Sequence, residues 1–270
     1  TVTADDQARV YGSSNPAFTQ TITGFVNGQN LASSGVTGSD VGSVTATSVS
    51  SVNTYVITAS SAGYSAANYN FATVNGTLTV NQRPITITAD ANQSKIYGNS
   101  DAVFTYTPEA NGVNRGLVGS DTFTGALARA SGESVGTYAI TQGTLANGNY
   151  AITYVSDNYS ITQRPITITA SPNQTKVYGS NDASFTYSVE ANSVNRGLVG
   201  SDTFSGSLTR VAGETVGAYA INQGTLANGN YAITYVSDNY AITQKALTVT
   251  ANQQQSTYGL SINLGATDFT

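Results

Sequence analysis

Residues 143–159 read GTLANGNYAITYVSDNY, and residues 224–240 carry the same letters without a change. Within this stretch, residues 150–155 alternate bulky and small side chains, which predicts a half-buried strand. Asn147-Gly148-Asn149 supplies the backbone freedom for a tight hairpin between two strands. An identical stretch that returns at a fixed distance indicates a tandem repeat of a small β-rich module.

The same period of 81 residues appears on either side of this stretch. Arg83-Pro84-Ile85-Thr86 returns at residues 164–167, and NRGLVGSDTF at residues 114–123 returns at 195–204. We therefore predict a divergent repeat 1 that lacks its first residues, two full repeats, and the start of a truncated repeat 4, in a longer parent protein. Their ranges are 1–82 for repeat 1, 83–163 for repeat 2, 164–244 for repeat 3 and 245–270 for repeat 4.

One repeat unit predicts six to eight short strands and at most one helical turn. In repeat 2 the strands are expected at residues 85–88, 96–101, 104–106, 123–127, 137–142, 150–155 and 158–162. Residues 109–121 are rich in glycine and asparagine and have room for a single helical turn. The predicted fold class is mostly β, with small modules arranged as beads on a string.

The junction between repeats 2 and 3 shows a change of parity. Tyr159 and Ile161 have odd numbers, whereas Ile166 and Ile168 have even numbers, so one continuous strand cannot face both cores with one side. A proline at this switch removes a ladder donor and fixes φ. We predict short, stiff structural joints, and a looser third joint where alanine replaces the proline. The predicted joint residues are Arg83, Pro84, Arg164 and Pro165.

Five motifs in this order resemble the MBG ("mostly beta-grasp") tandem repeat domains of bacterial filamentous-haemagglutinin-like surface adhesins. They are RPITITA at 83–89, K-[IV]-Y-G, NRGLVGSDTF, GNYAITYV and the closing NY[SA]IT. The resemblance implies small beta-grasp-like modules with at most a short helix. It also implies secretion to the cell surface and a role as an extended spacer or adhesive scaffold, and it supplies no catalytic or metal residues.

The composition excludes several classes of function. The chain has no His and no Cys, which rules out Ser–His–Asp and Cys–His catalysis and the common zinc sites. We predict no enzyme activity, no catalytic residues, no metal site and no cofactor. A net charge of −5 with scattered basic residues argues against nucleic acid as a partner. No apolar run approaches the roughly 18 residues that cross a bilayer, so no membrane insertion is expected.

Calcium binding and covalent cross-links are two alternative roles for the charged residues. The acidic residues are isolated in sequence, and Asp157 lies beside a turn where a carboxylate more often accepts backbone amides than binds a cation. Lys95 and Lys176 share one repeat position, but Arg9 occupies it in repeat 1, and arginine cannot form the amide of a lysine cross-link. The favoured interpretation is a lysine that flanks a Tyr-Gly turn.

A Tyr-Gly pair recurs in all four predicted repeats, and Tyr97 and Tyr178 are the candidate contact aromatics. They form either an aromatic platform for a sugar or, on the interpretation we favour, a core or edge tyrosine before a turn glycine.

Three functions remain open from the sequence. The favoured one is a structural stalk of a large secreted adhesin that projects a binding region or supports cell–cell and biofilm adhesion. A self-assembling extracellular fibre or biofilm-matrix subunit is second, and a carbohydrate-binding module is third. The expected partners are neighbouring repeats, other copies of the chain in the fibre alternative, and cell-surface or matrix glycans in the third. The expected location is the bacterial cell surface or a secreted matrix.

Overall fold

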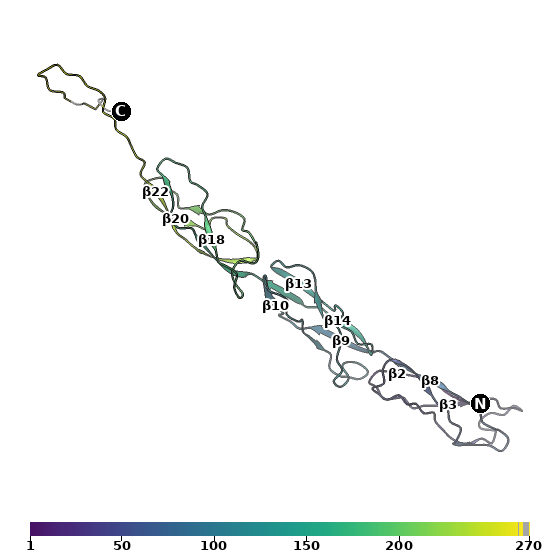
Figure 1. The fold of residues 1–270 in the computed structure, drawn as a ribbon. Helices are drawn as coiled ribbons and strands as arrows, with labels where there is room; N and C mark the ends of the chain where they lie inside the picture. Colours follow the sequence, from purple (N-terminus) through teal and green to yellow (C-terminus); the bar gives the residue numbers. More distant parts are fainter. Residues whose placement is uncertain (264, 267–269) are drawn as a thin grey trace. The chain divides into compact units, whose positions relative to one another are not determined.

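The computed structural model describes residues 1–263, 265–266 and 270 (Figure 1). Its contacts divide the chain into two compact units. Unit 1 comprises Thr1–Lys95 and Ser100–Ile161, and unit 2 comprises Ile96–Asn99 and Thr162–Thr270. The predicted range 245–270 includes residues 264 and 267–269, which lie outside the described residues. The division into four repeats stays a prediction, and the repeat names below refer to sequence ranges.

All regular elements of the described residues are strands, which confirms the mostly-β fold class. Repeat 1 contains β1 (Val2–Ala4), β2 (Gln7–Val10), β3 (Gln20–Ile22), β4 (Thr37–Gly38), β5 (Asn53–Ile57), β6 (Tyr64–Ser65), β7 (Thr73–Val74) and β8 (Gly76–Asn81). Repeat 2 contains β9 (Arg83–Ala89), β10 (Ser94–Ile96), β11 (Tyr106–Pro108), β12 (Ala128–Arg129), β13 (Gly136–Thr141), β14 (Tyr150–Val155) and β15 (Asn158–Thr162). Repeat 3 contains β16 (Arg164–Ala170), β17 (Gln174–Val177), β18 (Tyr187–Val189), β19 (Thr209–Arg210), β20 (Gly217–Asn222), β21 (Tyr231–Val236) and β22 (Asn239–Thr243).

Repeat 3, in unit 2, pairs its strands into two sheets. One sheet has the order β18-β16-β21, and the other has the order β17-β22-β20-β19. β16 and β21 run parallel with Ile166 opposite Ile233, whereas β20 and β22 are antiparallel. Repeat 2 has the same two orders, β11-β9-β14 and β10-β15-β13-β12. Figure 1 shows β9 beside β14, as the pairing requires.

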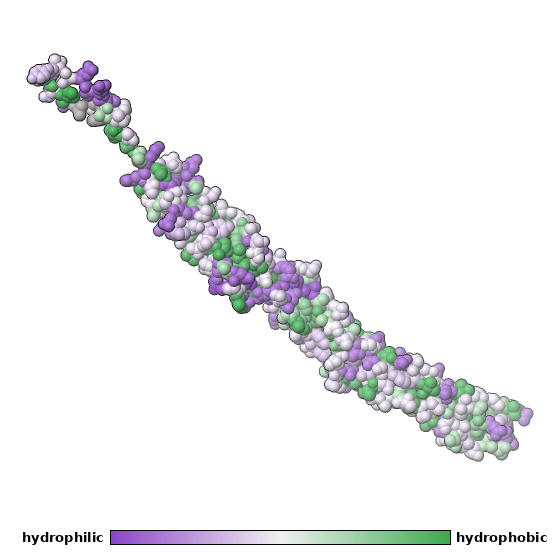
Figure 2. Space-filling model, viewed as in Figure 1, coloured by the Kyte–Doolittle hydropathy of each residue, from purple (hydrophilic) through white to green (hydrophobic). Residues whose placement is uncertain are grey.

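The core of repeat 3 lies between its two sheets. Ile168 of β16 and Ile221 of β20 are completely buried, and Tyr240 and Ile242 of β22 pack in the same cluster. These strands alternate buried and more exposed residues, as the period of two requires for a sheet with one face in a core. Polar residues dominate the opposite faces, and Figure 2 shows small apolar patches dispersed among polar residues on the face in view.

Of the seven strands predicted in repeat 2, two have the predicted bounds, four overlap a strand with shifted bounds, and one does not form. The strands predicted at 96–101 and 104–106 overlap β10 and β11 by one residue each. β14 and β15 have the predicted bounds, 150–155 and 158–162. The strand predicted at 123–127 is wrong, because only Thr124 forms an isolated bridge, to Ala146. Gly125 has φ 78°, a left-handed conformation that ends an extended segment.

The predicted hairpin at Asn147-Gly148-Asn149 is also wrong. The turn itself forms, since the Tyr150 amide donates to the Asn147 carbonyl at 2.9 Å. However, the strands on either side, β13 and β14, belong to different sheets. The turn therefore carries the chain from one layer of the module to the other.

The helical turn allowed at 109–121 does not form, and the described residues contain no helix. Asn114 and Gly116 adopt left-handed φ values of 59° and 80°, which interrupt any right-handed turn. Gly112 and Arg115 instead form an isolated antiparallel bridge. Among the described residues, no helix is long and apolar enough to cross a membrane.

Candidate functional site: the repeat joints

The first strand of repeat 2 begins at Arg83, whose side chain is only 3% exposed. Its guanidinium donates to the backbone carbonyls of Gly116 at 2.9 Å, Gly112 at 2.6 Å and Arg115 at 2.7 Å. It also donates to the carbonyl of Tyr11, in repeat 1, at 3.1 Å. A planar guanidinium with five N–H groups suits this ring of carbonyls, which a single ammonium group cannot satisfy. One side chain thus organises a loop of repeat 2 and holds the Tyr-Gly turn of repeat 1.

Unit 2 contains the same arrangement 81 residues later. Arg164 is 3% exposed and donates to the carbonyls of Gly197 at 2.9 Å, Ser193 at 2.7 Å and Arg196 at 2.9 Å. Its Nη1 atom donates to the carbonyl of Tyr97 at 3.1 Å. The predicted joint residues Arg83 and Arg164 therefore lie where consecutive Tyr-Gly turns are held.

Pro84 and Pro165 lie one residue further along the same strands. The carbonyl of each proline accepts the amide of the arginine-bound loop, from Gly116 and Gly197 respectively, at 2.9 Å. Each proline is the second residue of its strand and lies before the antiparallel neighbour begins to pair, at Ile87 and Ile168. Their part in limiting motion at the joints stays a prediction.

The Tyr-Gly turn of repeat 2 packs into a socket on repeat 3 within unit 2. The ring of Tyr97 meets the ring of Tyr231 edge-on, with centroids 5.5 Å apart. Both hydroxyls donate to Oδ2 of Asp202, Tyr97 at 2.9 Å and Tyr231 at 2.6 Å. The Val199 amide in turn donates to the Tyr231 hydroxyl at 3.0 Å. Burial makes the largest contribution to raising the pKa of Tyr231 to about 12, and the hydrogen bond to Asp202 contributes next.

Glycine is required in this turn for two reasons. Gly98 has φ 80°, and a Cβ placed on it would lie 2.5 Å from Cγ2 of Val199. In unit 1, Gly12 also has φ 80°, and its Cβ would lie 2.4 Å from Cγ2 of Val118. The valine of each socket thus rests directly on the glycine of the turn.

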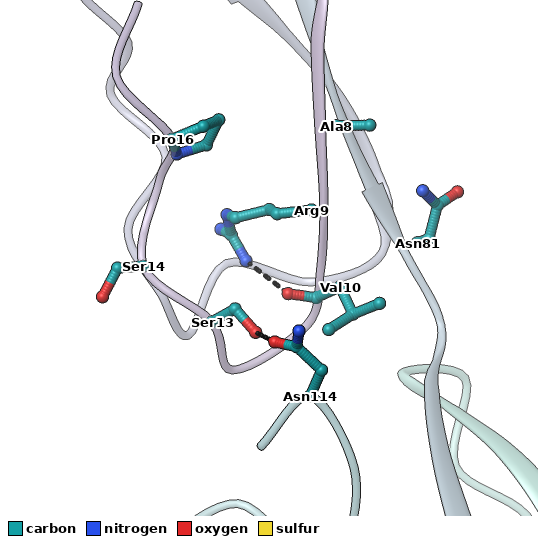
Figure 3. Close-up of a pocket in the computed structure, with 8 residues that line it drawn as sticks. All are labelled: Ala8, Arg9, Val10, Ser13, Ser14, Pro16, Asn81 and Asn114. Carbon is teal, nitrogen blue, oxygen red and sulfur yellow. Dashed lines mark hydrogen bonds between the residues drawn. The ribbon is translucent and has the colours of Figure 1, made fainter.

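In unit 1 the socket for Tyr11 is built from the same residue types. The rings of Tyr11 and Tyr150 are 5.6 Å apart, and the Tyr150 hydroxyl donates to Asp121 at 2.6 Å. Ser13 adds a bond from its hydroxyl to the Asn114 side chain at 2.8 Å, shown in Figure 3. The open hollow beside it has a volume of ≈ 410 Å³ and one charged lining residue, Arg9. That guanidinium is already bonded, to Asn15 and to nearby carbonyls.

The two candidate contact aromatics have different surroundings. Tyr97 is half-buried in the joint, whereas Tyr178, at the same position of repeat 3, is 50% exposed. Neither arrangement tests the sugar-platform alternative. The ring of Tyr97 is nonetheless already packed against another tyrosine.

We expect Tyr97→Phe to weaken the joint moderately. The substitution removes the hydrogen bond to Asp202 and keeps the ring contact, so unit 2 should lose about 1–2 kcal/mol of unfolding free energy. Chemical denaturation followed by circular dichroism measures it. Tyr178→Phe is the matched control, and an equal loss in both variants would show that the joint contact contributes nothing.

A four-residue ionic network lies next to the Tyr-Gly turns of repeats 2 and 3, and the sequence alone did not predict it. In repeat 3, Lys176 lies 2.8 Å from Asp182 and 2.5 Å from Glu214. Arg210 binds the same two carboxylates at 2.8 and 2.6 Å. Repeat 2 has the equivalent network, and its members are Lys95, Asp101, Arg129 and Glu133.

These pairs are salt bridges between oppositely charged groups. The hydrogen bond from Arg210 holds the pKa of Asp182 below its ordinary value. The hydrogen bonds to Asp182 and Glu214 raise the pKa of Lys176. Amide formation needs a neutral amine and a protonated acid, and both shifts oppose it. Among the described residues, no group of three His, Cys, Asp or Glu side chains is placed to hold a metal ion.

The lowered pKa values of the salt-bridged carboxyl groups predict that the protein loses stability in acid. The hydrogen bond from Arg196 lowers the pKa of Glu190 to about 2, and that from Lys176 lowers the pKa of Glu214. A carboxyl with a lower pKa when folded stabilises the protein above the pKa of the unfolded chain and loses this contribution as the pH falls. The chain has no His, so the melting temperature should stay level from about pH 7.5 to 5 and fall below about pH 4.5.

Thermal melting across this pH range tests the prediction, with Glu190→Gln as the comparison. That variant should have a shallower acid slope than the unchanged chain. A marked fall between pH 7 and 5 would contradict the assignment of the slope to these carboxylates.

No curated protein matches the chain. Among solved structures, the crystal structure of the I9–I11 tandem from titin is similar at 9% sequence identity. The alignment covers 90% of this chain and 99% of the titin chain. Its TM-score is 0.18, and a likeness this weak carries no argument.

A family model matches three times, over residues 1–79, 85–163 and 166–241, and its description is "MBG domain (YGX type)". MBG repeats are structural domains found in surface adhesin-like proteins, and they are not an enzyme family. The chain belongs to the MBG domain family of the YGX type.

Proposed function

We propose that the chain is a spacer segment of a large secreted bacterial surface adhesin, whose modules hold a binding region away from the cell. The observation that carries the proposal is the joint. Arg83 and Arg164 make the same set of bonds to their own loop and to the preceding Tyr-Gly turn. A joint conserved between successive modules lets length grow by duplication without a new interface.

The electrostatics and the surface also support a spacer. The guanidinium at each joint is bonded to carbonyls and is buried, so salt screens it less than it screens exposed ion pairs. Charged residues make up only 9% of the chain. The extracellular location and a role in cell–cell or biofilm adhesion are parts of this proposal.

The carbohydrate-binding alternative has less support. It depends on the Tyr-Gly aromatics, and the rings of Tyr11 and Tyr97 pack against tyrosines of the next module. The hollow shown in Figure 3 has no aromatic side chain among its lining residues.

Small-angle scattering of the chain and of a variant without residues 83–163 tests the spacer proposal. The deletion places Arg164 directly after Gln82 and keeps a complete socket for the Tyr11 turn. A spacer should shorten by the length of one module, on the order of 20–40 Å. A maximum dimension that hardly changes would contradict the proposal. Antibody labelling of intact source cells tests the surface location, with labelling expected before permeabilisation.

A further inference from the structure

In repeat 3, two long segments of the chain run side by side in the same direction. We call residues 164–177, which contain β16 and β17, the entry arm, and residues 231–243, which contain β21 and β22, the exit arm. β16 pairs with β21 in parallel over six residue pairs, and β17 pairs with β22 in parallel over four. The Tyr178 amide adds a bond to the Thr243 carbonyl at 2.8 Å. Parallel ladders therefore join the two arms along most of their length.

The chain enters this module at one end of the paired arms and leaves it at the other. Arg164 is the first residue of β16, and Thr243 is the last residue of β22. Tension along the chain therefore pulls the entry arm towards its N-terminal end and the exit arm towards its C-terminal end. Because the arms are parallel, these pulls act in opposite directions along the strands. The evenly spaced bonds of the ladders are then loaded together, in shear, rather than one after another.

Repeats 1 and 2 have the same arrangement. In repeat 2, β9 pairs with β14 in parallel over six residue pairs, and β10 lies next to β15. In repeat 1, β1 pairs with β7 and β2 pairs with β8, both in parallel. One residue, Gln82 or Gln163, separates the last strand of each of these repeats from the first strand of the next. Tension thus passes from each exit arm almost directly into the next entry arm.

The strands that receive the tension lie inside their sheets and not at the edges. β16 lies between β18 and β21, and β22 lies between β17 and β20. The equivalent strands β1, β8, β9 and β15 also have a neighbour on each side. Ile168 of β16 and Ile242 of β22 are buried in one core cluster. Sliding of either arm therefore breaks two ladders and drags buried side chains through a packed core.

We propose that each module resists tension along the chain, with its entry and exit arms acting as a mechanical clamp. The force at which a domain unfolds follows its unfolding rate and not its free energy of unfolding. A module with a small core can therefore be strong in this one direction. This function goes beyond the spacer role, because a spacer needs only length, and it depends on neither a binding region nor a surface location.

Single-molecule force spectroscopy in two pulling directions tests the clamp. The chain has no native Cys, so handles attach only at introduced cysteines. Handles at Gln163→Cys and Gln244→Cys load the arms in shear. Handles at Gln163→Cys and Gly229→Cys instead pull β16 and β21 from the same end, since the Gln163 side-chain amide donates to the Gly229 carbonyl at 3.1 Å. The unfolding force should be at least about twofold higher for the first pair of handles.

The two chains are matched controls for each other. All three handle positions are exposed, and a Cβ on Gly229 would meet no atom of the described residues within 4 Å. Their denaturation midpoints should therefore agree, so that only the direction of pulling differs. Equal unfolding forces for the two pairs of handles, or a higher force for the pair at 163 and 229, would overturn the proposal.

Pulling the unsubstituted chain from its two ends extends the test to the other modules. Each of repeats 1, 2 and 3 should unfold in one abrupt step that lengthens the chain by about 25 nm, the extended length of one repeat less its folded length. A smooth extension without steps would contradict the clamp. Scattering of the relaxed chain reports the spacer function separately, so the two proposals can fail independently.

Discussion

Replacing Arg164 by alanine is expected to lower the unfolding free energy of unit 2 by about 3 kcal/mol or more. The side chain is 3% exposed and donates to three carbonyls of its own loop as well as to Tyr97. Alanine removes the side-chain donor from the carbonyls of Gly197 and Tyr97, and each unsatisfied buried group costs about 1–3 kcal/mol. The carbonyls of Ser193 and Arg196 keep their mutual backbone hydrogen bonds. Hydrogen exchange should rise in peptides that cover residues 192–199 and residues 96–99.

Arg196→Ala is the matched control in the same loop. Its side chain is exposed and pairs with Glu190, while the joint uses only its backbone carbonyl. This variant should keep the joint and change stability little. Arg164→Lys should resemble Arg164→Ala, because an ammonium group cannot bond the whole ring of carbonyls. Equal denaturation midpoints for Arg164→Ala and Arg196→Ala would show that the arginine does not hold the joint.

The second large effect is expected for Gly98→Ala. A left-handed φ of 80° costs an alanine about 1–2 kcal/mol, and the new methyl group would lie 2.5 Å from Cγ2 of Val199. Valine is short and stiff, so relief of this overlap requires the turn to move out of its socket and adds about 1–3 kcal/mol. The ring contact between Tyr97 and Tyr231 should weaken with it.

Gly179→Ala separates the two contributions. Gly179 has nearly the same φ, 84°, but open space where its Cβ would be. It should therefore show the backbone cost alone. Denaturant unfolding of Gly98→Ala and Gly179→Ala measures the loss of unfolding free energy in each variant. An equal loss in the two would mean that the turn of Gly98 is not packed against repeat 3 in solution.

The sequence predicted best the strands whose side chains alternate cleanly. The YAITYV and NYSIT segments form β14 and β15 with the expected bounds, since burial on one face requires this period. The segment at 123–127 has a similar composition, but Gly125 adopts a left-handed φ there. Alternation alone does not reveal whether a glycine continues a strand or ends it, and this explains the wrong strand.

The hairpin failed for a topological reason. The residues Asn147-Gly148-Asn149 correctly predict a turn. A turn, however, does not specify that its flanking strands pair with each other. β14 pairs with β9 in parallel, from more than sixty residues earlier in the chain. Such nonlocal pairing depends on the packing of the two sheets, which no single segment encodes.

The parity change predicts joints, but it does not predict the hydrogen bonds of Arg83 and Arg164. Their partners are mostly backbone carbonyls, which leave no trace in residue identity. The relay from Asp121 to Tyr150 had a signal, because both residues recur in repeat 3 as Asp202 and Tyr231. Recurrence between repeats singles out these positions, but it does not show that the two side chains form a hydrogen bond.

The sequence also contains a signal for the ionic network. The signal lies in pairs of positions that change together between repeats, and single positions do not show it. Lys95 and Asp101 recur together in repeat 3. In repeat 1, Arg9 and Asn15 stand in their places and bond to each other at 2.8 Å. A paired change from Lys and Asp to Arg and Asn indicates contact, and comparison of pairs rather than of single positions would have found it.

We propose that a buried arginine, Arg83 or Arg164, holds the Tyr-Gly turn of the module before it and joins the two modules rigidly. Pulsed electron–electron double resonance across the first joint tests this most directly. The spin labels are placed at Val56→Cys and Val155→Cys, which are two exposed positions within unit 1. The account predicts one narrow distance distribution that broadens strongly in Arg83→Ala. A broad distribution in the unsubstituted joint, or a width that Arg83→Ala leaves unchanged, would contradict it.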